Sequence, residues 1–143
     1  MSEIHRVSPE EAQGLLEQGY VYVDVRSEPE FVQGHVPGAY NVPLLHQGPG
    51  GLRENPDFLA VMEQAFGKDE PLLLGCRSGG RSLKAAQMLA RAGYTNLREL
   101  RTGWDGSRDA FGRPEPGWGK KGMPAETGTP AGRGYADVRA RRG

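Results

Sequence analysis

The residue best suited to chemistry is Cys76, the only cysteine, which opens the segment Cys76–Ser82 with the sequence CRSGGRS. This segment separates an apolar stretch at 71–75 from a helix-like stretch at 83–92. Backbone amides at a helix N-terminus and nearby guanidinium groups both attract an anion. They should favour the thiolate form of Cys76, which is the nucleophilic form of cysteine. The alternative is a buried structural thiol, but such a thiol would more often lie inside the apolar stretch.

The composition is that of one domain with one core, since the chain has 143 residues. Its formal net charge is zero, which gives no electrostatic reason to expect nucleic-acid or membrane binding. Of the 22 glycines and 11 prolines, 9 and 4 lie after Gly103, so we expect a compact domain up to about Leu100 and a loop-rich part beyond it.

A single cysteine excludes an intramolecular disulfide, so any group formed on Cys76 must pass to an external acceptor. No cluster of cysteine and histidine suggests a metal, and we expect no cofactor. The segment 1–6 lacks the apolar run of a signal peptide, and no stretch has transmembrane length. We therefore expect a cytoplasmic protein.

Strands and helices alternate along the sequence. Ser8, Pro9 and Glu11 form a helix start with a capping box, and apolar runs of β-branched and aromatic residues indicate buried strands. The expected strands cover 4–7, 20–25, 40–43, 72–74 and 96–100, the expected helices cover 8–19, 27–32, 55–66 and 83–92, and a glycine-rich loop covers 46–51. This order predicts an α/β fold, with a mostly parallel sheet and helices on both faces. Ligands bind at the C-terminal ends of such strands, where Cys76 lies.

Several ordered motifs make the chain similar to the rhodanese (thiosulfate sulfurtransferase) family, as a single-domain member. The matching motifs are Val23-Asp24-Val25-Arg26, Glu30-Phe31, Gly34-His35-Val36-Pro37-Gly38-Ala39, Asn41-Val42-Pro43, Cys76-Arg77-Ser78-Gly79-Gly80-Arg81, Gly93-Tyr94 and Leu97–Leu100. The resemblance implies a rhodanese-like domain whose active-site loop begins at Cys76. Related cell-cycle phosphatases carry one more residue between the cysteine and the arginine, so the shorter loop here favours sulfur transfer over phosphatase or arsenate chemistry.

The resemblance also implies a mechanism in two covalent steps. The Cys76 thiolate attacks the outer sulfur of a donor such as thiosulfate, sulfite leaves, and the persulfide passes its sulfur to cyanide or to a thiol. The substrate-binding residues implied by the resemblance are those of the loop: Arg77, Ser78, Gly79, Gly80, Arg81 and Ser82. Arg77 is the stronger candidate for binding a charged donor, whereas Arg81 could instead support the turn.

Four further residues near the expected site have both functional and structural interpretations, and we favour the structural ones. Arg26 with Glu30 could form a partly buried ion pair, and Asp24 could orient the neighbourhood of the site. His35 could satisfy backbone groups in its turn. No observation makes His35 a general base.

The sequence departs from the family pattern after Gly103. Residues 117–124 resemble the last part of the family pattern, and residues 105–116 separate them from the part that ends at Gly103. We therefore expect residues 105–116 to be an inserted polar loop near the active-site face. The mildly basic residues 128–143 are expected to form a flexible tail. Residues 1–127 would then be a single rhodanese-like domain.

Two functions follow from the resemblance. The first is a sulfurtransferase that moves sulfane sulfur from thiosulfate, or a related small anion, through a Cys76 persulfide to cyanide or a thiol. The alternative is a sulfur-relay module that passes persulfide sulfur between a protein donor and a protein acceptor, with little turnover on free thiosulfate. A non-catalytic interaction domain is a weaker third possibility, because the Cys76 loop is intact.

Overall fold

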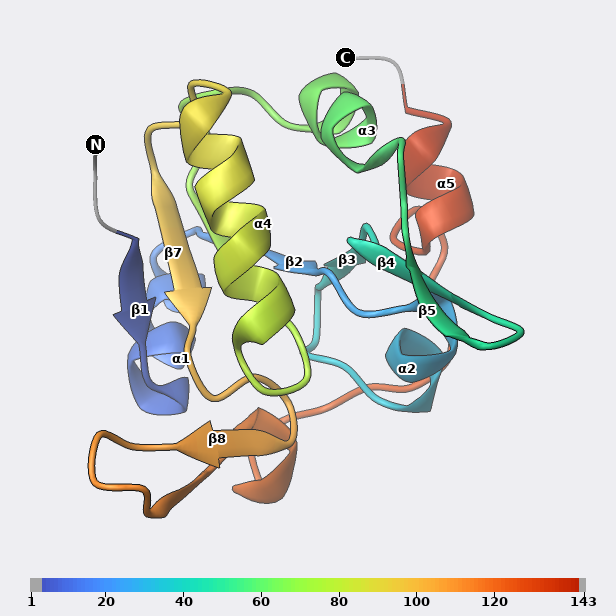
Figure 1. The fold of residues 1–143 in the computed structure, drawn as a ribbon. Helices are drawn as coiled ribbons and strands as arrows, with labels where there is room; N and C mark the ends of the chain where they lie inside the picture. Colours follow the sequence, from blue (N-terminus) through green and yellow to red (C-terminus); the bar gives the residue numbers. More distant parts are fainter. Residues whose placement is uncertain (1–3, 142–143) are drawn as a thin grey trace.

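A five-stranded parallel sheet forms the centre of the computed structural model, which describes residues 4–141 (Figure 1). The strand order is β1-β7-β6-β2-β3, and every neighbouring pair is parallel. The bounds are β1 His5–Val7, β2 Val21–Asp24, β3 Tyr40–Asn41, β6 Leu72–Gly75 and β7 Leu97–Leu100. This confirms the parallel sheet that the alternating pattern predicts.

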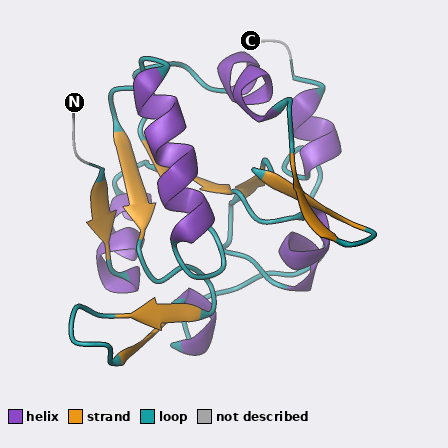
Figure 2. Ribbon diagram, in the orientation of Figure 1, coloured by secondary structure: helices purple, strands orange, loops and turns teal. Residues whose placement is uncertain are grey.

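Helices cover both faces of the sheet, as Figure 2 shows. Their bounds are α1 Pro9–Glu17, α2 Glu28–Gln33, α3 Phe58–Ala65, α4 Gly80–Arg91, the 3₁₀ turn η1 Trp118–Lys120 and α5 Tyr135–Arg139. The core has two parts: one face packs against α3, α4 and α5, and the other against α1, α2 and η1. Leu72 and Leu74 belong to the first part and Leu73 to the second, because successive strand residues point to opposite faces.

The expected start of α1 is confirmed in detail. The Glu11 amide donates to the Ser8 hydroxyl at 3.1 Å, and the Ser8 amide donates to the Glu11 carboxylate at 3.0 Å. This capping box satisfies two donors that a helix start leaves free. Its position sets the turn from β1 into α1.

The expected glycine-rich loop at 46–51 is wrong. The structure has an antiparallel hairpin there, β4 Leu45–Gly48 and β5 Gly51–Glu54. Gly50 and Gly51 have φ of 87° and 113°, a region that glycine adopts without penalty and that a tight hairpin turn requires.

The inserted residues 105–116 also form a hairpin rather than a plain loop, with β8 Gly106–Arg108 and β9 Pro114–Pro116. It projects from the molecule below the start of α4 in Figure 1. Its tip residue Phe111 is 84% exposed.

The structure places a helix in the segment that the sequence predicts to be a flexible tail. Tyr135 and Val138 of α5 are buried in the same core as α3 and α4. The Tyr135 hydroxyl also accepts a hydrogen bond from the buried Asn55 amide at 3.0 Å. Two buried side chains one helical turn apart are too weak a sequence signal to predict this helix. The predicted domain limit at 127 therefore leaves out residues that share its core. Among residues 4–141, no helix is long and apolar enough to cross a membrane.

Candidate active site

Cys76 lies at the C-terminal end of β6, at the turn into α4. Only 2% of the surface of Cys76 is exposed to solvent. The sulfur Sγ accepts a hydrogen bond from the Gly79 amide at 3.1 Å, and the Ser82 hydroxyl oxygen lies 3.3 Å from it. Gly79 is the N-cap residue of the twelve-residue helix α4, and Ser82 lies in its first turn. The polar contacts distinguish Cys76 from a thiol packed only among apolar side chains, and the helix N-terminus favours negative charge at this point.

Gly79 can only be glycine at this position of the loop. Its φ is 96°, in the left-handed region, and a Cβ atom there would overlap the carbonyl oxygen of Arg101 and the guanidinium of Arg6. The same Arg6 guanidinium donates to the Gly79 carbonyl at 3.1 Å. Strand β1 therefore contributes directly to the shape of the Cys76 loop.

The guanidinium of Arg81 forms an ion pair with the carboxylate of Glu30 on α2. Its two guanidinium nitrogens donate to the two carboxylate oxygens at 2.8 and 2.9 Å. Burial by itself raises the pKa of Glu30, but the hydrogen bonds from Arg81 and Ser27 outweigh it and lower that pKa to about 2. The hydrogen bond to Glu30 likewise raises the pKa of Arg81. This bidentate pair joins the start of α4 to α2, as the supporting interpretation of Arg81 predicts.

Arg77 is bound to a different carboxylate, that of Asp105 at the start of the inserted hairpin. Arg77 Nε donates to Asp105 Oδ2 at 2.7 Å, and the two side chains are 66% and 38% exposed. Two backbone hydrogen bonds run beside this pair: the Trp104 amide donates to the Cys76 carbonyl and the Asp105 amide to the Arg77 carbonyl, both at 2.8 Å. The inserted segment is thus part of the loop's surroundings.

The expected ion pair between Arg26 and Glu30 is wrong. Arg26 instead donates to Asp24 Oδ2 at 2.7 Å and to the Gly34 carbonyl at 2.6 Å. Burial alone would lower the pKa of Arg26, but the neighbouring Asp24 carboxylate raises it. The buried pair fixes the turn after β2, and Glu30 remains available to Arg81.

His35 is fully buried and lies away from Cys76 in its contacts. Nδ1 is 2.7 Å from the Phe31 carbonyl oxygen and Nε2 is 3.1 Å from Glu126 Oε1. Its ring stacks on that of Phe31 with a centroid separation of 3.8 Å. These contacts join α2 to the segment after η1, and the structural role of His35 stays a prediction.

Three residues near the loop have no place in the sequence-based site. Besides Asp105, the structure adds Glu99 of β7 and Arg6 of β1. The Ser82 hydroxyl donates to Glu99 Oε2, and Arg6 Nε donates to Glu99 Oε1 at 2.5 Å. A charged residue inside the buried run Leu97–Leu100 was the available signal, because buried charges require partners.

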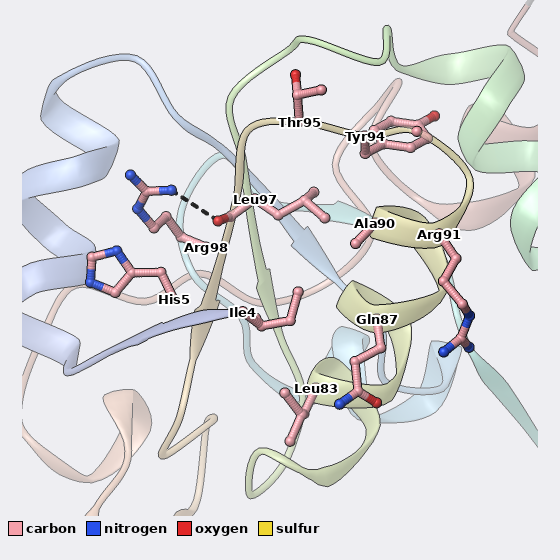
Figure 3. Close-up of a pocket in the computed structure, with 11 residues that line it drawn as sticks. Ile4, His5, Leu83, Gln87, Ala90, Arg91, Tyr94, Thr95, Leu97 and Arg98 are labelled. Carbon is pink, nitrogen blue, oxygen red and sulfur yellow. Dashed lines mark hydrogen bonds between the residues drawn. The ribbon is translucent and has the colours of Figure 1, made fainter. Parts of the chain in front are cut away.

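A separate groove of about 1000 Å³ opens beside α4, β7 and the residues around β1 (Figure 3). Among the described residues, its lining includes Leu83, Tyr94 and Leu97 but no member of the segment 76–82. The groove is therefore distinct from the Cys76 loop.

The model of the rhodanese-like domain matches residues 8–110. The chain belongs to the rhodanese family. It is 39% identical over 120 residues to thiosulfate sulfurtransferase 16, chloroplastic, of Arabidopsis thaliana, covering 84% of this chain and 91% of the relative. It is 34% identical over 105 residues to thiosulfate sulfurtransferase GlpE of Pseudomonas fluorescens, covering 73% and 85%.

Solved structures agree with the rhodanese fold. The crystal structure of Rv0390 from M. tuberculosis superposes with a TM-score of 0.72 at 30% identity, covering 89% of this chain and 100% of that one. The family and the fold predicted from the motifs are thus confirmed. The cytoplasmic location stays a prediction, since one relative is named as chloroplastic. The functional roles assigned to the loop residues also stay predictions.

Proposed function

We propose that this rhodanese is a sulfurtransferase that takes sulfane sulfur from thiosulfate, or a related anion, onto Cys76 and passes it to cyanide or a thiol. The observation that carries the proposal is the position of the Cys76 sulfur at the start of α4, where it accepts a hydrogen bond from the Gly79 amide. A backbone donor at a helix N-terminus suits a sulfur atom that is an anion for part of the cycle.

In the first half-reaction the Cys76 thiolate attacks the outer sulfur of thiosulfate. A bond forms between the two sulfurs, the bond to the sulfonate sulfur breaks, and sulfite leaves with the electron pair. The exposed Arg77 guanidinium is the donor-binding group, because guanidinium matches the oxygens of an oxyanion. To bind thiosulfate it must exchange its contact with Asp105.

In the second half-reaction cyanide attacks the outer sulfur of the persulfide. Thiocyanate forms, and the Cys76 thiolate leaves and is regenerated. The charges balance in both steps, so the cycle needs no redox cofactor. A thiol acceptor would take the same sulfur and become a persulfide.

The test is to incubate the purified protein with thiosulfate, measure its intact mass, then add cyanide and follow thiocyanate. Gain of one sulfur at Cys76 followed by rapid multiple turnover would establish the sulfurtransferase. Loading without efficient turnover would support the relay alternative, in which a protein supplies or accepts the sulfur. Absence of loading would count against thiosulfate as the donor.

Cys76→Ser is the matched control, since an alcohol cannot form a persulfide. The same samples assayed with arsenate and with an aryl phosphate test the choice between chemistries. The short loop between Cys76 and Arg81 should give no activity on either.

A further inference from the structure

Glu99 is buried beside the candidate nucleophile, which is an unfavourable place for a carboxylate unless it is bound. Its residue exposure is 0%. One carboxylate oxygen accepts from Arg6 at 2.5 Å and the other from the Ser82 hydroxyl. Both oxygens of Glu99 therefore act as acceptors, one for a guanidinium and one for a hydroxyl.

Ser82 lies between this carboxylate and the sulfur of Cys76. Its hydroxyl oxygen is within hydrogen-bond reach of both Glu99 Oε2 and Cys76 Sγ, but a serine hydroxyl has only one hydrogen to donate. A carboxylate oxygen is a strong hydrogen-bond acceptor, whereas cysteine sulfur is a weak one.

We propose that Glu99 is a positioning residue for sulfur transfer: it accepts the hydroxyl hydrogen of Ser82 and so withholds this donor from the sulfur of Cys76. The proposal rests on the proposed sulfurtransferase function. The sulfur then keeps the Gly79 amide as a donor but loses the help of the nearest hydroxyl. A less stabilised thiolate is the more basic and the more nucleophilic one.

A more basic Cys76 thiolate changes the rates of the two half-reactions in opposite directions. During loading, Cys76 is the attacking thiolate, and a more basic thiolate attacks faster once it is ionised. During discharge, Cys76 is the leaving group, and a more basic thiolate leaves more slowly. Glu99 therefore favours loading relative to discharge.

Glu99→Gln is the informative variant because Arg6 decides how the amide is oriented. Arg6 can only donate, so it binds the amide oxygen, and the NH₂ group then faces Ser82. The Ser82 oxygen must accept from that NH₂, and its hydrogen turns to the sulfur. The substitution removes the charge of Glu99 itself and leaves in place Tyr22 on β2 and Arg81 on α4, the two groups whose pKa values the charge of Cys76 raises.

The first measurement is the pH dependence of Cys76 alkylation by iodoacetamide, which requires no sulfurtransferase activity. We expect its midpoint to fall by about one pH unit in Glu99→Gln. Ser82→Ala alone should leave the midpoint within about 0.3 unit of the wild type, because its hydrogen is not given to the sulfur. Ser82→Ala combined with Glu99→Gln should lose most of the downward shift.

Two results would overturn the proposal. One is an upward shift in Ser82→Ala alone, which would mean that the hydroxyl already donates to the sulfur. The other is an equal downward shift of Glu99→Gln with and without Ser82, which would mean that the carboxylate acts through space. Circular dichroism checks that each variant folds. If Glu99→Gln does not fold, the alkylation midpoint of Ser82→Ala still tests whether the hydroxyl donates to the sulfur.

The second measurement separates the half-reactions in protein that loads with thiosulfate. With the thiolate fully ionised, Glu99→Gln should load about threefold more slowly and discharge to cyanide about threefold faster, from a Brønsted slope of about 0.4 to 0.5. A merely structural role would slow both steps, and that result would also contradict the proposal.

Glu115→Gln is the matched control, since Glu115 is likewise paired with an arginine, Arg101, at 2.5 Å. A wild type that does not load thiosulfate would refute the proposed function but leave the alkylation result intact.

Discussion

The Cys76 loop is bound on two sides by arginine–carboxylate pairs that differ in burial. On the α2 side, Arg81 and Glu30 form two hydrogen bonds, and their side chains are 14% and 24% exposed. On the side of the inserted hairpin, Arg77 and Asp105 form a single hydrogen bond, and their side chains are 66% and 38% exposed. The loop therefore has one enclosed pair and one open pair.

The difference indicates different functions for two arginines that look alike in the sequence. Removing one partner of an enclosed pair leaves an unpaired charge that water reaches poorly, and this is costly. An exposed pair contributes little to stability, and its guanidinium can exchange one anion for another. The contrast supports our proposal that Arg81 holds the loop in place and that Arg77 binds the donor.

Arg81→Ala tests the enclosed pair and should have the largest effect. It leaves the Glu30 carboxylate half-buried without its partner, so we expect the free energy of unfolding to fall by about 3 kcal/mol. Urea denaturation at pH 7 measures this. Loading and discharge should both slow, because the loop loses its contact with α2. An unchanged unfolding free energy would contradict the supporting role.

Acid titration tests the same pair without removing a side chain. The pKa of Glu30 is lowered from about 4.5 to about 2, so its contribution is present above about pH 4.5 and is lost as the pH falls toward 2. The full shift corresponds to about 3 kcal/mol, and partial exposure reduces this to about 2 kcal/mol. The stability difference between wild type and Glu30→Gln should shrink over this interval in urea titrations. A constant difference would mean that Glu30 titrates normally.

Arg77→Ala tests the open pair and should affect binding more than stability. We expect the KM for thiosulfate to rise about tenfold, with little change in the rate of cyanide discharge or in the unfolding free energy. Steady-state kinetics and single-turnover discharge of loaded protein measure the two effects. Arg113→Ala, which removes an exposed arginine from the far end of the same hairpin, is the control. An equal loss in both half-reactions would exclude a donor-binding role for Arg77.

The sequence predicts the position of the candidate nucleophile better than the contacts of the loop that holds it. Cys76 follows from residue type and from its place between a strand and a helix, which are local properties. The pairing of Glu30 with Arg81 rather than Arg26 depends on the tertiary fold, which brings the start of α4 next to α2, and the two residues are 51 positions apart. The contact of Glu99 with Ser82 depends on the register of β7 beside β6. Such contacts between distant segments are set by tertiary packing, which local patterns do not record.

The contact between Asp105 of the inserted hairpin and Arg77 is likewise not predicted from the sequence. A substitution at Asp105 should have the smallest effect of those considered. Asp105→Asn keeps the side-chain shape and the backbone hydrogen bond to the Arg77 carbonyl, but removes the negative charge that occupies the Arg77 guanidinium. A charged donor would then meet less competition, and we expect the KM for thiosulfate to fall about twofold to threefold at low ionic strength.

The fall should disappear in the double variant Arg77→Ala with Asp105→Asn, and it should weaken as salt is added, because both charges are exposed. Persistence of the effect without Arg77 would mean that Asp105 repels the donor directly instead of competing for the guanidinium. In that case the exposed pair would affect donor binding through the negative charge of Asp105. It would then differ from the pair of Arg81 and Glu30 in this repulsion, and not in having a guanidinium that can exchange its partner.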